Sequence, residues 1–77
     1  MMIKKNDKIM LNMNIPEHKL LKGALGKVIF IHNEGEEFDI EFRNIIGELL
    51  AVIRLIPAQF HKLNIIQVQQ VKKFNLN

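Results

Sequence analysis

The chain has 77 residues, no cysteine, 48% hydrophobic residues and a formal net charge of +3. This length allows one domain with a core that is only just large enough, and the lack of cysteine excludes a disulfide and a thiolate metal site. We therefore expect a single domain over 1–77, with a core over about 5–68 and a C-terminal tail over 69–77.

Five segments have the composition or the alternation of a β-strand. In chain order they are residues 8–15, 27–32, 37–43, 49–56 and 61–68. The third segment is the clearest, because Phe38, Ile40 and Phe42 alternate strictly with charged residues, which gives one apolar and one charged face. The second and third segments are adjacent in the chain and predict an antiparallel hairpin.

Glycine and proline mark the connections between these segments. They are a long excursion over 16–26, two tight turns over 33–36 and 44–48, and a 3₁₀ turn over 57–60. In the excursion we expect Gly23 and Gly26 at left-handed or closely packed positions, and Gly35 should supply the left-handed position of the first tight turn. The order predicts an all-β fold, a small SH3-like five-stranded barrel with a C-terminal extension that is a strand or a short helix.

The N-terminus and the hydropathy pattern bear on location. Residues 1–11 contain lysines but no long apolar run and no cleavage site of small residues, so they do not have the features of a signal peptide. No segment reaches 18 uninterrupted apolar residues, which excludes a membrane-spanning helix. We expect a soluble, cytoplasmic, bacterial-type protein with no membrane partner.

Charge is segregated along the chain, because both ends are basic and the middle is acidic. The acidic residues of the second hairpin are Glu34, Glu36, Glu37, Asp39 and Glu41. An acidic face can steer a basic partner, and the alternative is a solvated face that only keeps the domain soluble. We predict that these five carboxylates contribute to partner binding and give the two interpretations equal weight.

The segment over 49–56 is apolar on both faces, whereas a small barrel has only one core to cover it. One face carries Leu50, Val52 and Ile56 with Arg54. The other carries the four residues that we assign to partner binding, Leu49, Ala51, Ile53 and Leu55. The face that the core does not cover could be covered by the C-terminal tail, by a second copy of the chain or by another protein. A homo-oligomer is therefore one of the open alternatives.

The residue pattern predicts no catalytic residue, no metal site and no cofactor. His18, His32 and His61 are dispersed and do not reproduce a zinc-ligand spacing, and no nucleophile–base pair is evident. Gly23-x-x-Gly26 lacks the lysine and hydroxyl residue of a phosphate-binding loop, so we interpret it as a turn.

Four segments in fixed order resemble the DUF4926 family of small bacterial proteins. They are IPEH over 15–18, LKGxxGxV over 21–28, FDIEF over 38–42 and LIPAQF over 55–60, and the resemblance covers about residues 5–63. The chain departs from the family pattern by an additional Ile56 and by an unmatched tail from about residue 64. The resemblance implies an SH3-like barrel with no established enzymatic activity and partners among toxin-like or other neighbouring gene products.

We therefore expect a non-enzymatic protein-binding module that binds a partner, preferentially a basic one, through the acidic hairpin and the fourth strand. The most specific version of this hypothesis is an immunity- or antitoxin-like role. The alternative is a nucleic-acid- or ribosome-associated barrel of the KOW or Tudor type that uses its terminal lysines, namely Lys4, Lys5, Lys8, Lys72 and Lys73. We rank it lower because the third strand presents carboxylates to solvent. Base stacking also needs exposed aromatic side chains, and those expected in the core are Phe30, Phe38, Phe42 and Phe60.

Overall fold

A computed structural model describes residues 2–64 of the chain. The five strands are β1 (Lys8–Leu11), β2 (Leu25–His32), β3 (Glu37–Arg43), β4 (Leu49–Leu55) and β5 (Phe60–Lys62). Three 3₁₀ turns connect them, at Pro16–His18, Asn33–Gly35 and Pro57–Gln59. The described residues contain no α-helix, which confirms the all-β class.

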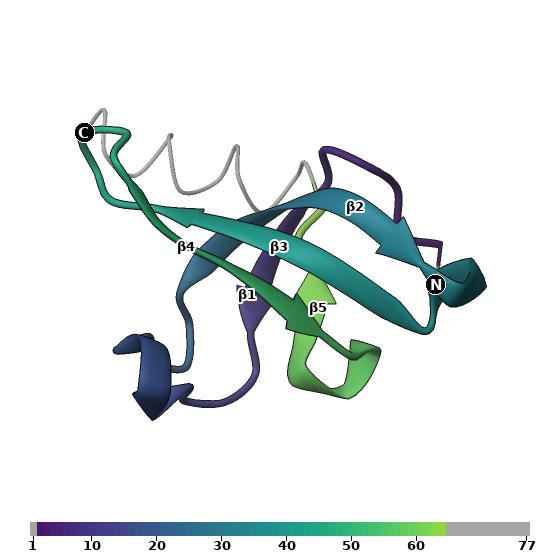
Figure 1. The fold of residues 1–77 in the computed structure, drawn as a ribbon, viewed down its shortest axis with the longest axis horizontal. Coiled ribbons are helices and arrows are strands. Elements are labelled where there is room, and N and C mark those ends of the chain that lie inside the picture. The colour runs from purple at the N-terminus through teal and green to yellow at the C-terminus, as the bar shows by residue number, and fades with distance from the viewer. Residues whose placement is uncertain (1, 65–77) are drawn as a thin grey trace.

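The strands form one antiparallel sheet with the order β4-β3-β2-β1-β5 (Figure 1). The short β5 returns beside β1, so the first and last strands are neighbours although they lie far apart in the sequence. Within the described residues β4 and β5 do not pair with each other, and the sheet is curled and open rather than a closed barrel.

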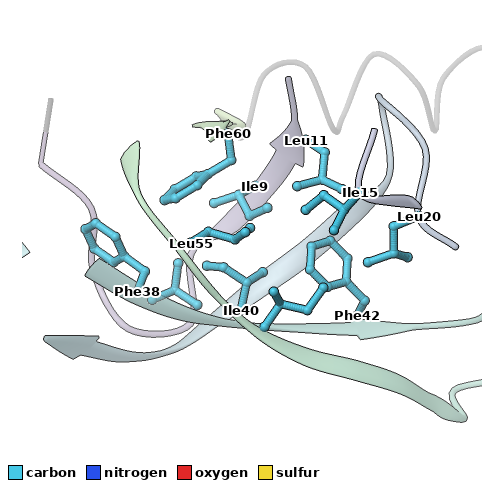
Figure 2. Close-up of a cluster of buried hydrophobic side chains, with 11 residues drawn as sticks. Ile9, Leu11, Ile15, Leu20, Phe38, Ile40, Phe42, Leu55 and Phe60 are labelled. Carbon is cyan, nitrogen blue, oxygen red and sulfur yellow. The ribbon is translucent and has the colours of Figure 1, made fainter. Parts of the chain in front are cut away.

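The concave side of the curled sheet holds the hydrophobic core (Figure 2). Its buried members are Ile9, Leu11, Ile15, Leu20, Val28, Phe38, Ile40, Phe42, Ile53, Leu55 and Phe60. Phe38 and Phe60 meet edge to face with ring centroids 5.4 Å apart, an arrangement that the quadrupoles of the two rings favour. All five strands contribute to this core, so the sheet curls around side chains that alternate inward along each strand.

The strand ends differ from the sequence prediction mainly at β1, which ends at Leu11 instead of Ile15. Bends follow at residues 12 and 13, and in the loop beyond them Asn14 Oδ1 accepts the backbone N–H of Lys22 at 2.7 Å, as asparagine often does in turns. The predicted third strand is confirmed without change. The fifth strand begins one residue earlier than predicted, and its predicted end at residue 68, like the tail, lies outside the described residues.

The glycine predictions are confirmed, and the turns form where they were expected. Gly23, Gly35 and Gly47 all have positive φ, and Gly26 is buried against the core. Only residues without a Cβ adopt such φ values freely, which explains glycine at the three turn positions.

A β-bulge in β2 overturns one expectation for the core. Val28 pairs with Ile40, but Phe30 pairs with Asp39, so Ile29 is an additional residue between them. A single added residue reverses the facing of every side chain beyond it. Phe30 therefore lies on the outer face, 56% exposed, and Ile31 packs against the core instead.

A second irregularity lies in β4, where Phe42 pairs with Ala51 but Arg43 pairs with Leu49. Leu50 is the additional residue, and it lines a groove with Leu20 and Phe42 at the rim of the core. The simple alternation expected for the fourth strand therefore stops at Ala51.

Candidate functional site

The three carboxylates on β3 are each held by neighbouring groups. Glu37 Oε1 accepts a hydrogen bond from Asn33 Nδ2 at 2.7 Å. Asp39 contacts His32 Nε2 at 2.8 Å and Arg54 Nε at 3.1 Å, one from each neighbouring strand. His32 Nε2 also lies 3.2 Å from Arg54 Nη2, so the three side chains form one cluster around the Asp39 carboxylate.

The negative charge of Glu41 is likewise offset by neighbouring cations. Arg43 Nε and Nη2 donate to its two carboxylate oxygens at 2.9 and 3.2 Å, and Lys27 Nζ lies 3.8 Å from Oε1. The acidic run of the sequence thus becomes an interleaved set of opposite charges once the strands pair. The face of β3 offers little net charge to a partner, which the sequence alone did not indicate.

These contacts lower the pKa of both carboxyl groups. For Asp39 the hydrogen bond from His32 is the largest cause, desolvation opposes it, and Arg54 adds to the lowering. For Glu41 the hydrogen bond from Arg43 is the largest cause, and the same bond raises the pKa of Arg43. Hydrogen bonds to the charged form favour that form, so both carboxylates stay ionised at neutral pH.

Glu34 and Glu36 differ from the strand carboxylates. Their side chains are exposed, and within the described residues they form neither a hydrogen bond nor an ion pair. They lie in and just after the 3₁₀ turn Asn33–Gly35, which connects β2 to β3 at one end of the sheet (Figure 1). These two residues are the part of the predicted acidic site that remains available to a partner.

A groove with both polar and apolar lining lies beside this turn, with a volume of about 620 Å³. We call it the hairpin groove, and its lining residues are Met2, Ile3, Glu34, Gly35, Phe38, Pro57 and Phe60. The edges of two core aromatics reach it, and Met2 is 74% exposed at its mouth. Three segments that are distant in the sequence build it, so neither spacing nor periodicity could indicate the groove in advance.

The predicted binding face of the fourth strand is corrected by the structure. Ile53 and Leu55 are buried in the core and Ala51 packs against it, so these three side chains hold the fold together. Leu49 is exposed, as is Val52 on the outer face. The reason is the direction of curl, because the sheet closes over the face that carries Ile53 and Leu55.

The outer face carries an aromatic residue that the sequence interpretation had placed in the core. Phe30 lies against His32 with ring centroids 4.6 Å apart and planes tilted by 33°. Arg54 and Asp39 complete this row across three strands. The only signal for it in the sequence is the run of four apolar residues over 28–31, which has no alternation to define a face.

Histidines and carboxylates do not gather elsewhere in the described part of the chain. Residues 2–64 contain no group of three or more His, Asp or Glu side chains placed to hold a metal ion. His18 is exposed at the end of its 3₁₀ turn, and His61 hydrogen-bonds to Asn12. The same residues contain no helix with the length and hydrophobicity required to span a bilayer.

Comparison with known proteins gives a family but no characterised relative. No curated protein and no solved structure matches the chain significantly. Residues 5–62, which include all five strands and the hairpin groove apart from Met2 and Ile3, match the model of a domain of unknown function, DUF4926. The match covers most of the chain, and the chain therefore belongs to the DUF4926 family.

Proposed function

We propose that the chain is a non-enzymatic protein-binding module that recognises its partner at the hairpin groove and the two carboxylates beside it. The observation that carries the proposal is the position of Glu34 in the lining of a groove of about 620 Å³. Glu36 follows at the end of the same turn, and neither carboxylate is paired within residues 2–64. Apolar contact area with a charged rim is the usual arrangement of a binding surface.

The chemistry of the groove defines the partner. Met2, Ile3 and Pro57 in its lining suit an aliphatic or aromatic side chain, and Glu34 suits a lysine or an arginine next to that side chain. Within residues 2–64 neither Glu34 nor Glu36 has a cationic partner, so a basic protein would be attracted without first displacing an ion pair of that region. We infer a basic protein segment with an apolar anchor.

The exposed edge of β4 adds a second means of contact. β4 is the last strand of the sheet and has seven residues, and no strand within residues 2–64 pairs with its outer side. Edge strands of this kind accept an added strand from another chain. An immunity- or antitoxin-like role is one form of this proposal, in which the bound partner is a toxin-type protein made by a neighbouring gene.

Capture of partners from a lysate of the native host tests the proposal. The bait is the tagged full-length chain, compared with a Glu34→Gln/Glu36→Gln variant and with Glu17→Gln as the matched control. Glu17 is also exposed and forms no ion pair with the described part of the chain, but it lies in the 3₁₀ turn Pro16–His18, outside the hairpin groove.

We expect one protein to be captured in stoichiometric amount by the wild type and by Glu17→Gln and to be lost from the double variant. Its association rate should fall as salt screens the carboxylates. A protein retained equally by all three baits at low salt would show that binding does not use this site. Met2→Ser should weaken the same complex through loss of apolar contact.

A nucleic-acid-binding function is the second candidate, and the exposure of Phe30 favours it. Barrels that bind single strands stack bases on exposed aromatic side chains, and Lys4, Lys5 and Lys8 are exposed on the same domain. Lys72 and Lys73, the other lysines of this hypothesis, lie outside the described residues. If the function is correct, gel-shift binding to single-stranded RNA should weaken with salt and with Phe30→Ser; no binding at low salt rejects it.

A further inference from the structure

The turn between β3 and β4 carries two isoleucines that the turn itself does not need. Ile45 is 103% exposed and Ile46 is 75% exposed. Tight turns normally contain small or polar residues at such positions. Large aliphatic side chains held in water at a protruding tip are unfavourable for an isolated domain and are typical of contact surfaces.

The backbone of this tip is fixed by other residues. Asn44 Oδ1 accepts the N–H groups of Ile46 and Glu48 at 3.1 and 2.9 Å, and Gly47 has a φ of +88°. Arg43 Nη1 donates to the carbonyl of Gly47 at 2.7 Å. The two isoleucines are therefore presented by a rigid turn, which lowers the entropy lost when they are bound.

An apolar groove of about 330 Å³ lies next to the tip. We call it the tip groove, and its apolar lining is Leu20, Ala24, Leu25, Phe42 and Leu50, with Ile45 at its edge. Leu25 and Leu50 are each 56% exposed. The protruding apolar tip and the apolar groove are therefore adjacent, since Ile45 belongs to both. The β3–β4 turn lies at the end of the sheet opposite the β2–β3 turn (Figure 1).

Charges around the two features are also complementary. Glu48, at the base of the tip, is exposed and has no cationic partner within residues 2–64. Lys22, in the loop that supplies Leu20 and Ala24 to the groove, is exposed and has no acidic partner in the same part of the chain. Glu48 and Lys22 do not pair with each other within one molecule. In a two-fold dimer that places each tip at the groove of the other copy, Glu48 of one copy would face Lys22 of the other.

We propose that the tip of one molecule binds in the tip groove of a second copy, and the reverse, in a symmetric dimer. The isoleucine tip, residues 44–48, fills the groove of the partner copy, and Glu48 faces Lys22 of that copy. An interface in which the same patch serves both molecules is the usual form of a two-fold dimer. This surface is at the other end of the sheet from the hairpin groove, so the dimer does not depend on the proposed function.

Sedimentation equilibrium of the full chain over a range of concentrations tests the dimer. Ile45→Asn/Ile46→Asn should weaken self-association about tenfold or more, because the buried anchors are lost while Asn44 and Gly47 keep the turn. Ile56→Asn is the matched control, since it makes the same change at an exposed isoleucine outside the tip, and it should leave the dimer unchanged. A full chain that is monomeric at all concentrations overturns the proposal.

A charge exchange distinguishes a second copy from any other occupant of the groove. Glu48→Lys and Lys22→Glu should each weaken the homodimer, whereas an equimolar mixture of the two variants should form a heterodimer in which both pairs are attractive. Equal self-association of all variants, or weakened association that mixing does not restore, contradicts the proposal. A full chain that stays monomeric and instead binds vesicles of anionic lipid overturns it in favour of a membrane contact.

Discussion

Gly26 lies so close to Ile40 that no side chain fits between them. A Cβ placed on Gly26 would be 2.6 Å from Ile40 Cγ2 and 2.9 Å from Phe42 Cε1. Both neighbours are almost fully buried, so neither can move without disturbing the packing of β3 against β2. The glycine is thus required by close approach rather than by backbone conformation.

The first prediction is that Gly26→Ala destabilises the domain by about 1–3 kcal/mol, the usual result of overpacking a core. Urea unfolding monitored by circular dichroism measures the change. Ala24→Ser, two residues earlier in the chain and only partly buried, should change the stability by less than about 0.5 kcal/mol. Equal stability of Gly26→Ala and the wild type would mean that β2 and β3 are farther apart than described.

The second prediction concerns the bulge in β2. Phe30→Ser should cost little, about 0.5 kcal/mol or less, because the ring is 56% exposed on the outer face. Phe42→Ala should cost about 3–5 kcal/mol, because that ring is 1% exposed in the core. The same unfolding experiment compares the two, and a large loss from Phe30→Ser would show that the strand continues without a bulge.

The bulge also shows which structural features the sequence alone does not determine. β3 could be predicted to the residue because apolar and charged side chains alternate along it, and Gly23 and Gly35 are recognisable from turn chemistry. The run over 28–31 is apolar throughout, so the sequence allows either register and only the packing against β3 selects one. The curl of the sheet likewise decides which face of β4 is buried.

The ion pairs on the outer face also depend on how the strands pair. The sequence places Glu37, Asp39 and Glu41 at repulsive spacing. Arg43 on the same strand is the nearest cation to Glu41, but the cations beside Asp39 come from the two neighbouring strands. Which cation meets which carboxylate depends on the strand register, which the bulge shifts by one residue. The hairpin groove depends still more on the assembled fold, since its walls come from the N-terminal residues, the β2–β3 turn and the segment after β4.

The third prediction is a pH dependence that arises from Asp39. Its pKa is lowered in the folded state below the ordinary value for aspartate, chiefly by the hydrogen bond from His32, so the folded protein favours the ionised form. A lowered folded pKa stabilises the protein above about pH 4, and this contribution is lost as the pH falls through the folded pKa. Asp39→Asn should therefore be less stable than the wild type at pH 7, by roughly 1 kcal/mol or less for a partly exposed ion pair.

Urea unfolding at pH 7 and near pH 2.5 measures this difference. The difference in stability between wild type and Asp39→Asn should be smaller at the acidic pH, because the advantage of the ionised carboxylate is lost as the pH falls through the folded pKa. Glu34→Gln is the control, because Glu34 has no ion pair within the described residues and should show no such convergence. A gap of constant size at both pH values would mean that the His32 and Arg54 contacts do not act on the charge of Asp39.

The fourth prediction separates stability from binding at Glu34. This residue has a φ of +56° and follows Asn33 at +50°, so two successive residues with side chains lie in the left-handed region. That conformation is unfavourable for glutamate and better tolerated by asparagine. Glu34→Asn should therefore raise the free energy of unfolding by about 0.5–1 kcal/mol, since strain at binding sites is commonly relieved by such changes.

The same substitution removes one of the two free carboxylates beside the hairpin groove. We therefore expect Glu34→Asn to be more stable than the wild type and yet to bind the basic partner more weakly. Glu36→Gln provides the comparison, because Glu36 has a negative φ and its substitution should weaken binding without a gain in stability. A Glu34→Asn variant that gains stability and keeps full affinity would place the binding site away from this turn. A variant that loses stability would show that the left-handed turn depends on the glutamate side chain.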